Sequence, residues 1–292
     1  MKRHAIATLV FVLAFTSNAF ADDEQPVGDG SAAPPAGPAV VEQPTTPPPK
    51  PTSMTLKQGA VFVQVNAEMS MSKDKVLEPL SLAPDISYGV NDDLTVSLIH
   101  STAAFTGFRG GSGAGLCVTG TDGGCVNVYN NVGAEGLYSL LKGNFAVAAK
   151  AGVLTEFVDV AMEGKTFFQA KVGANTRYTM GNVFVQFNPA VWIPLNETDA
   201  NKPQIWLPVA LWVKVMPPLS LFAASGLKGA TSNAMDAGFG DLYTINLGGG
   251  AQYTINKTVA VGGSFIFGTM FGAPDTTGPD SRAVHLWLNY SM

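Results

Sequence analysis

The feature that most constrains the fold is a strict two-residue alternation of side chains between residues 167 and 193. Even-numbered residues from Phe168 to Tyr178 are mostly apolar, whereas the odd-numbered ones are polar or glycine. After Met180-Gly181-Asn182, apolar residues continue on odd numbers from Val183 to Ile193. Because successive side chains of a β-strand point to opposite faces, the pattern predicts two antiparallel strands with one shared apolar face.

The same alternation recurs along most of the chain beyond Leu56, in about twelve segments at nearly even spacing. The composition agrees with this pattern, since 46% of the residues are hydrophobic but no apolar run after residue 21 approaches the roughly 18 residues of a membrane helix. The sequence therefore predicts an all-β fold. The segments are 61–70, 81–90, 94–98, 132–141, 145–153, 168–179, 183–193, 205–216, 219–228, 243–255, 259–267 and 282–292.

Connections between the segments alternate between tight turns and longer polar loops, of which the longest covers about residues 107–127. Short turns at one rim and long loops at the other are typical of transmembrane β-barrels. An even number of strands then leaves both chain ends on the short-turn side. The predicted tight turns are Asn91-Asp92-Asp93, Lys142-Gly143-Asn144, Met180-Gly181-Asn182, Pro217-Pro218 and Asn256-Lys257-Thr258.

Five tyrosines share the apolar parity of their segments and precede a short turn or the end of the sequence by a few residues. The topology places them at one height around a barrel, as in the aromatic belt of a lipid–water interface. A soluble β-sandwich offers no reason to hold tyrosines at one rim. The predicted belt consists of Tyr88, Tyr138, Tyr178, Tyr253 and Tyr290.

Two N-terminal segments precede the alternating region. Residues 1–21 combine Lys2 and Arg3, a short apolar core and Ala19-Phe20-Ala21, which predicts a cleaved signal peptide rather than a membrane anchor. Residues 22–56 are rich in Pro, Ala and Thr and are predicted to be a disordered periplasmic arm. This arm is either a passive spacer, a tether to the cell wall or a tail that occludes a pore.

With its signal peptide, alternating strands and aromatic belt, the sequence resembles the Gram-negative outer-membrane β-barrel superfamily over residues 57–292. Its last strand carries Val284, Leu286 and Leu288 on alternate positions and closes with Met292, where the superfamily usually has an aromatic residue. The resemblance implies a transmembrane antiparallel up-and-down barrel of about twelve strands in the outer membrane. It also implies contact with outer-membrane lipid and recognition of the last strand by the barrel-insertion machinery.

The two cysteines, Cys117 and Cys125, both lie in the longest loop. A close pair in an exported protein predicts a disulfide that staples this loop. No metal site and no cofactor are predicted. The formal net charge of −5, without a cluster of Lys or Arg, does not favour nucleic acid as a partner.

The polar parity, which would face the lumen, has an uneven distribution of charge. Acidic residues come from the first four segments and basic residues from the fifth to the ninth. Opposed acidic and basic walls tune ion selectivity in pores. An alternative is that Glu135 and Lys150 pair across the hairpin and help close the barrel. The predicted lumen-lining residues are Glu68, Asp85, Glu135, Lys150, Lys171, Arg177, Trp192, Trp212, Lys214 and Lys228, with Trp206 on the same parity.

These features favour a narrow passive channel for small polar or anionic solutes. The main alternative is a non-conducting structural or adhesion barrel whose bore is plugged by Trp192 and Trp212. A less favoured alternative is a lipid-modifying barrel enzyme, suggested by His100-Ser101-Thr102, in which threonine stands where such enzymes have serine. His100 is expected on the outward, apolar parity, and the protein is not expected to be an enzyme.

Overall fold

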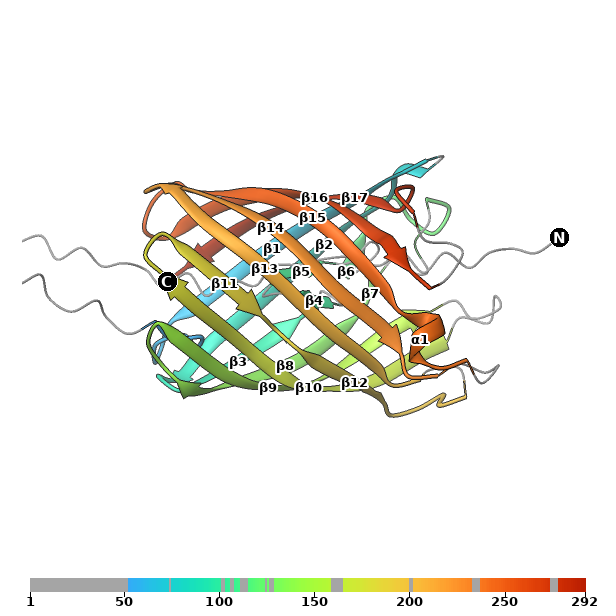
Figure 1. The fold of residues 1–292 in the computed structure, drawn as a ribbon, viewed down its shortest axis with the longest axis horizontal. Coiled ribbons are helices and arrows are strands. Elements are labelled where there is room, and N and C mark those ends of the chain that lie inside the picture. Colours follow the sequence, from blue (N-terminus) through green and yellow to red (C-terminus); the bar gives the residue numbers. More distant parts are fainter. Residues whose placement is uncertain are drawn as a thin grey trace, which may run out of the picture.

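The computed structural model describes residues 52–73, 75–100, 103–105, 108–110, 115–123, 125, 129–158, 165–199, 202–232, 237–273 and 278–292. Most of these residues belong to one antiparallel sheet that closes on itself as a barrel of twelve strand positions. Figure 1 shows the tilted strands of this barrel in side view. The predicted all-β, up-and-down barrel of about twelve antiparallel strands is confirmed.

Eleven strand positions are filled by one strand each, and the twelfth by the collinear pair β11 and β12. Along the chain, each position pairs with the one before it and the one after it. The barrel strands are β1 (Val61–Ser72), β2 (Lys75–Asn91), β3 (Leu94–Ile99), β8 (Val132–Leu141), β9 (Phe145–Val158), β10 (Lys165–Met180), β11 (Val183–Phe187), β12 (Ala190–Pro194), β13 (Gln204–Met216), β14 (Leu219–Ala230), β15 (Thr244–Thr254), β16 (Val259–Gly272) and β17 (Arg282–Ser291).

The barrel closes where β1 pairs with β17, with Val63 opposite Tyr290 and Glu68 opposite His285. On its other side β1 pairs with β2. The remaining described elements are short and lie in the connections. They are β4 (Ala103–Phe105), β5 (Phe108–Gly110), β6 (Gly115–Cys117), β7 (Tyr129–Asn130) and the four-residue helix α1 (Phe239–Leu242). Within the described ranges, no helix is long and apolar enough to cross a membrane.

The barrel sheet is apolar on its outer face and polar on its inner face, the reverse of the surface and core of a soluble protein. On β13, Val209 and Leu211 point outward and are 40% and 46% exposed, whereas Trp212 points inward and is fully buried. Among the largest fully buried side chains are Lys150, His285 and several amides. An apolar outer face around a polar inner face is the arrangement of a barrel that spans a bilayer.

The connection between the first two strands differs from the predicted loop. β1 and β2 stay paired, with a bulge between Met69 and Met71, as far as Ser72 opposite Lys75, so the hairpin closes with a very short turn. Figure 1 shows this hairpin projecting beyond neighbouring strands. Val76 and Leu77 are both exposed, so the two faces of this hairpin are in contact with solvent. Because neither face is buried, the sequence there has no alternation of apolar and polar residues.

The predicted strand 183–193 is interrupted at Asn188 and Pro189, which separate β11 from β12. Proline has no backbone N–H to donate to a neighbouring strand. The carbonyl of Pro189 still accepts from the N–H of Ala174 at 3.0 Å, and the N–H of Asn188 donates to Pro208 at 3.2 Å. The two short strands therefore keep one place in the barrel.

The predicted disulfide between Cys117 and Cys125 is present in the structure. Cys117 ends β6, whose Cys117 and Leu116 pair with Ser81 and Leu82 on the extended part of β2. The staple thus holds a loop that is itself hydrogen-bonded to the projecting hairpin.

The short turns gather at the rim where the chain ends near Met292, on the left in Figure 1. Residues 52–56 lie at this rim too, and Met54, Thr55 and Leu56 are buried. The assignment of residues 52–56 to the disordered arm was therefore wrong, because their backbone and side chains pack against the barrel. The predicted signal peptide and the rest of the predicted arm, residues 1–51, lie outside the described residues.

Candidate functional site

The inner face of the barrel carries the charged residues expected there. The acidic ones lie on β1, β2 and β8, and the basic ones lie on the contiguous wall from β9 to β14. Most are buried, but Lys228 is half-buried and Lys214 is exposed near the short-turn rim. The buried charged residues are Glu68, Asp85, Glu135, Lys150, Lys171 and Arg177.

Glu135 and Lys171 form an ion pair in which both side chains are almost completely buried. Glu135 lies opposite Gly152 of β9, and Lys150 lies opposite Leu137, with a bulge between Ser139 and Leu141. The Nζ of Lys150 donates to the Oδ1 of Asn175 at 2.8 Å. Glu135 on β8 is thus paired with Lys171, two strands away on β10. The sequence suggested a pair with Lys150, which lies on the strand between them.

Three inward cations lie over aromatic rings. The Nζ of Lys171 is 4.9 Å from the ring centre of Trp192, and that of Lys228 is 3.9 Å from the ring of Trp206. The two indoles are in contact, with ring centres 5.7 Å apart. Cation–π attraction of this kind orients long basic side chains along a wall. The predicted tryptophans and lysines therefore form one cluster on β10, β12, β13 and β14.

Closer to the short turns, aromatic rings form a second cluster. Trp212 stacks between Phe184, at 5.6 Å, and Phe222, at 4.3 Å. The ring of Trp287 lies 6.2 Å from that of Phe222. These contacts join strand positions at most three apart. The rings therefore form a layer on one side of the inner face of the barrel.

Glycines on β15 and β16 make room for this aromatic cluster. A Cβ at Gly262 would lie 2.2 Å from the Cε2 and Cζ2 atoms of Trp287. A Cβ at Gly250 would lie 2.8 Å from the ring of Phe222. The glycine-rich inner face of these two strands is therefore the surface on which the rings rest.

A set of amides continues the lining from β15 across the closure to β1. The Nε1 of Trp287 and the Nδ2 of Asn289 donate to the Oε1 of Gln252 at 3.1 and 3.2 Å. The Nε2 of Gln64 donates to Asn289 at 2.9 Å, and His285 bonds Asn66 at 3.0 Å. Sequence analysis did not select these amides, although their position on the inward parity was a usable signal.

His100 does not face the membrane, which corrects the expectation from its parity. β3 ends at Ile99, and the backbone N–H of His100 donates to the carboxylate of Asp85 at 2.7 Å. Its buried ring contacts the carbonyl of Pro84 and the ring of Tyr129, whose centre is 5.8 Å away. Ser101 and Thr102, the other members of the suggested motif, lie outside the described residues.

The five tyrosines of the predicted belt all point outward and are between 41% and 53% exposed. They lie close to the short-turn rim, and neighbouring residues extend the aromatic surface. Tyr178, for example, pairs with Phe145 on one side and Val185 on the other. The outer face at this rim is therefore amphipathic, as a lipid–water interface requires.

A scan against protein families found no match, and a search of curated proteins found none either. Comparison with solved structures gave clear similarities. The NanC porin superposes with a TM-score of 0.52 and 9% identity, over 78% of this chain and 98% of that one. The COG4313 outer membrane channel from Pseudomonas putida F1 gives 0.53 and 13% identity, over 82% and 97%.

At such low identity the similarity concerns architecture, and it extends over almost the whole length of both known channels. It agrees with the closed sheet, the apolar outer face and the polar lumen described above. This chain therefore has the fold of the outer-membrane β-barrel porins.

Proposed function

We propose that this protein is a narrow passive channel of the outer membrane for small polar or anionic solutes. The observation that carries the proposal is the lining of the lumen, where charged residues are placed on the inner face of a closed barrel. Burying charge is unfavourable unless it is paired or serves a function. A barrel that needed only to be stable would do better with an apolar or glycine-rich interior.

The arrangement of the lining supports a preference for anions. Basic side chains occupy the wall from β9 to β14, and acidic side chains occupy β1, β2 and β8. Such opposed walls produce a field across the bore that orients dipolar solutes and tunes ion selectivity. The predicted lining contains more basic than acidic residues, so anions are favoured.

The location follows from the two faces of the barrel. The apolar outer face is placed in lipid, with the tyrosine belt at the periplasmic interface. Residues 1–21 would direct export, and residues 22–51 would form the periplasmic arm before the folded segment begins. The last strand would be the element read by the insertion machinery.

A non-conducting structural barrel is the second candidate. The aromatic cluster around Trp212 favours it, because stacked rings on one side of the lumen narrow the bore. The lipid-modifying alternative is less favoured, because the ring of His100 is buried against Tyr129 and does not lie on the outer face.

Planar-bilayer recording of the refolded protein tests the proposal. The wild type is expected to give stepwise currents with a reversal potential that favours anions in a salt gradient. Lys171→Glu and Lys214→Glu are expected to shift this potential toward cation preference. Lys75→Glu is the matched control, because Lys75 is exposed on the projecting hairpin.

Absence of current from protein shown to be folded by heat-dependent migration on gels would instead support the structural barrel. Current with an unchanged reversal potential in both lumen variants would contradict the charged-wall part of the proposal. Deleting residues 22–51 distinguishes the roles of the arm, because current that appears only after deletion would identify the arm as a plug.

A further inference from the structure

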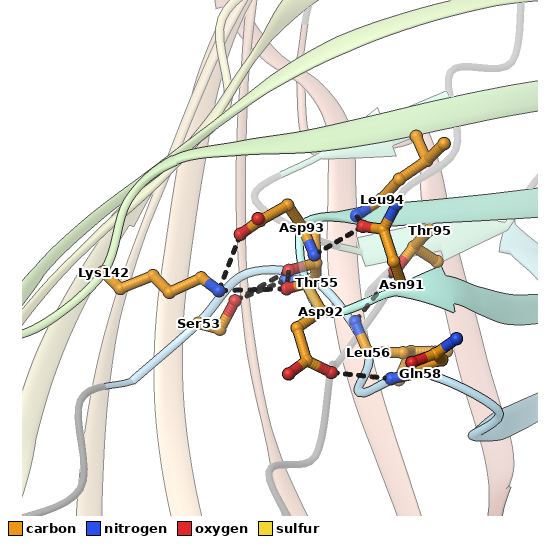
Figure 2. A network of polar contacts seen from close by, with 10 residues as sticks. All are labelled: Ser53, Thr55, Leu56, Gln58, Asn91, Asp92, Asp93, Leu94, Thr95 and Lys142. Atoms are coloured by element: carbon orange, nitrogen blue, oxygen red, sulfur yellow. Dashed lines mark hydrogen bonds and ion pairs between the residues drawn. The ribbon is translucent and has the colours of Figure 1, made fainter.

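The chain does not enter β1 from outside the barrel. Residues 52–58, which we call the N-terminal strap, run along the inside of the short-turn rim before β1 begins at Val61. Figure 2 shows the strap lying against the β2–β3 turn, with Lys142 reaching the same turn from the neighbouring hairpin. The strap is thus surrounded by residues far from it in sequence.

The first part of the strap is held on β8 and β9. Thr52 exchanges hydrogen bonds with Gly143 in the turn between these strands, and the N–H of Gly143 donates to the Thr52 carbonyl at 3.0 Å. Met54 is 2% exposed and packs with Leu137, Ala146 and Ala148. The alanines leave the space on the inner wall that the methionine fills.

The middle of the strap is fastened to the β2–β3 turn and to β3. The hydroxyl of Thr55 donates to the carbonyl of Asp92 at 2.9 Å. The N–H of Leu56 donates to the buried hydroxyl of Thr95 at 2.8 Å, and that of Gln58 donates to the Asp92 carboxylate at 2.9 Å. The bond from Leu56 is buried, so it satisfies a backbone N–H that would otherwise lack a partner.

The turn that receives the strap is itself braced. Lys142 forms an ion pair with Asp93 at 2.7 Å and donates to the carbonyl of Asp92 at 3.1 Å. The two short turns that hold the strap are therefore tied to each other (Figure 2).

Gly89 shows how closely the strap approaches the wall of β2. A Cβ at this position would lie 2.0 Å from the carbonyl oxygen of Lys57 and 3.2 Å from the Cβ of Leu56. Gly89 lies on the same parity of β2 as the inward Asp85. Only glycine leaves room for the strap backbone on this inner face.

Together these contacts trace the strap across the inner faces of β9, β8, β3 and β2. For twelve strands about 4.8 Å apart and tilted by about 40°, the backbone cylinder is roughly 24 Å wide. One further chain against the wall takes about 5 Å, on the order of a fifth of this width.

We infer that the N-terminal strap is a specificity-determining element of the channel: it sets the size limit for solutes at the periplasmic mouth. This inference rests on the proposed channel function. Met54 and Leu56 are its bulkiest buried side chains, and its many fixed contacts make it a permanent part of the mouth.

Single-channel conductance and the exclusion of polyethylene glycols of graded size test the inference in the full-length chain. Met54→Gly with Leu56→Gly removes the buried side chains that hold the strap on the wall, and Gly89→Leu pushes the strap off the wall of β2. A change of conductance by about 1.5- to 2-fold is expected from the altered cross-section, with a shifted polymer cutoff. Removal of residues 22–58 is expected to increase conductance beyond removal of 22–51 alone.

Asn256→Ala is the matched control. The Asn256 carboxamide oxygen accepts from the N–H groups of Thr258 and Val259, so the variant weakens another turn at the same rim. It is expected to lower thermal stability while leaving conductance and polymer cutoff unchanged. If the strap only stabilised the barrel, all the strap variants would likewise have lower thermal stability with unchanged conductance and polymer cutoff.

The outcomes separate the two proposals. Silence of the wild type and of every folded variant would contradict the channel function itself. Current with the same conductance and cutoff in the wild type, the Met54→Gly, Leu56→Gly variant and the chain without residues 22–58 would overturn the role of the strap while leaving the channel intact.

Discussion

Lys171 on β10 and Glu135 on β8 form a buried ion pair across β9, although a whole strand lies between them. Gly152 is opposite both residues in the ladder. A Cβ at Gly152 would lie 3.3 Å from the Cβ of Glu135. The absence of a side chain on the middle strand therefore lets the two long side chains meet above it.

Lys171→Met is expected to destabilise the barrel, because it leaves the Glu135 carboxylate buried without this partner. Breaking a buried pair in this way typically lowers the free energy of unfolding by about 3–5 kcal/mol. Urea titration followed by tryptophan fluorescence measures the change. Reversing both charges should recover most of the loss, and Lys75→Met on the exposed hairpin should have almost no effect. Equal stability of the two lysine variants would contradict the importance of the pair.

The outer face of β13 should tolerate charge according to depth. Val209 lies near the middle of the strand and Met216 is its last residue, and both are exposed. Arginine at the lipid midplane destabilises a barrel by about 2–4 kcal/mol, against about 0–1 near the interface. Val209→Arg should therefore reduce folding stability in liposomes far more than Met216→Arg. Similar losses for the two variants would show that this face does not lie in the bilayer.

Gly262→Ala should disturb the aromatic wall, because the new methyl group would occupy the position of the Trp287 indole. Overpacking of this kind usually destabilises by about 1–3 kcal/mol. Near-ultraviolet circular dichroism should change together with the unfolding midpoint. Gly136→Ala is the control, since a Cβ there meets only the Ala151 carbonyl at 3.9 Å. A spectrum unaltered by Gly262→Ala would argue against a tightly packed cluster.

Replacing Cys117 and Cys125 together by serine should loosen the loop without weakening the barrel. The bridge joins residues eight apart, and β6, which carries Cys117, pairs with β2 without being one of the twelve barrel positions. Limited proteolysis should become faster in the loop, whereas the urea midpoint of the barrel should stay the same. A lower barrel midpoint would mean that the loop supports the strands beside it.

The sequence was most informative where a strand has one lipid face and one lumen face. Alternation then determines which residues point inward, as it did for Lys171 and Trp212. It does not determine which inward residues touch each other. The bulge near Ser139 shifts the β8–β9 register, and so Glu135 meets Lys171 beyond Gly152.

The strap escaped sequence analysis for a different reason. Met54, Thr55 and Leu56 follow a Pro-rich segment and lie before the first alternating strand, so no period marks them as folded. Their burial depends on the inner faces of β3, β8 and β9, which come together only in the closed barrel. Gly89 was the local signal, but glycines are common near turns of every kind and do not by themselves indicate a second chain close by.

The pairing of β1 with β17 has a consequence for how the molecule forms. Every other pairing of barrel positions joins consecutive positions along the chain, whereas Gln64 and Asn289 meet across 225 residues. A seam of this separation carries the largest loop-closure entropy and is expected to form late. Until it does, β1 and β17 are two open edges whose peptide groups have no partners in lipid. The pairing of β1 with β17 is therefore the step that closes the open sheet into a barrel.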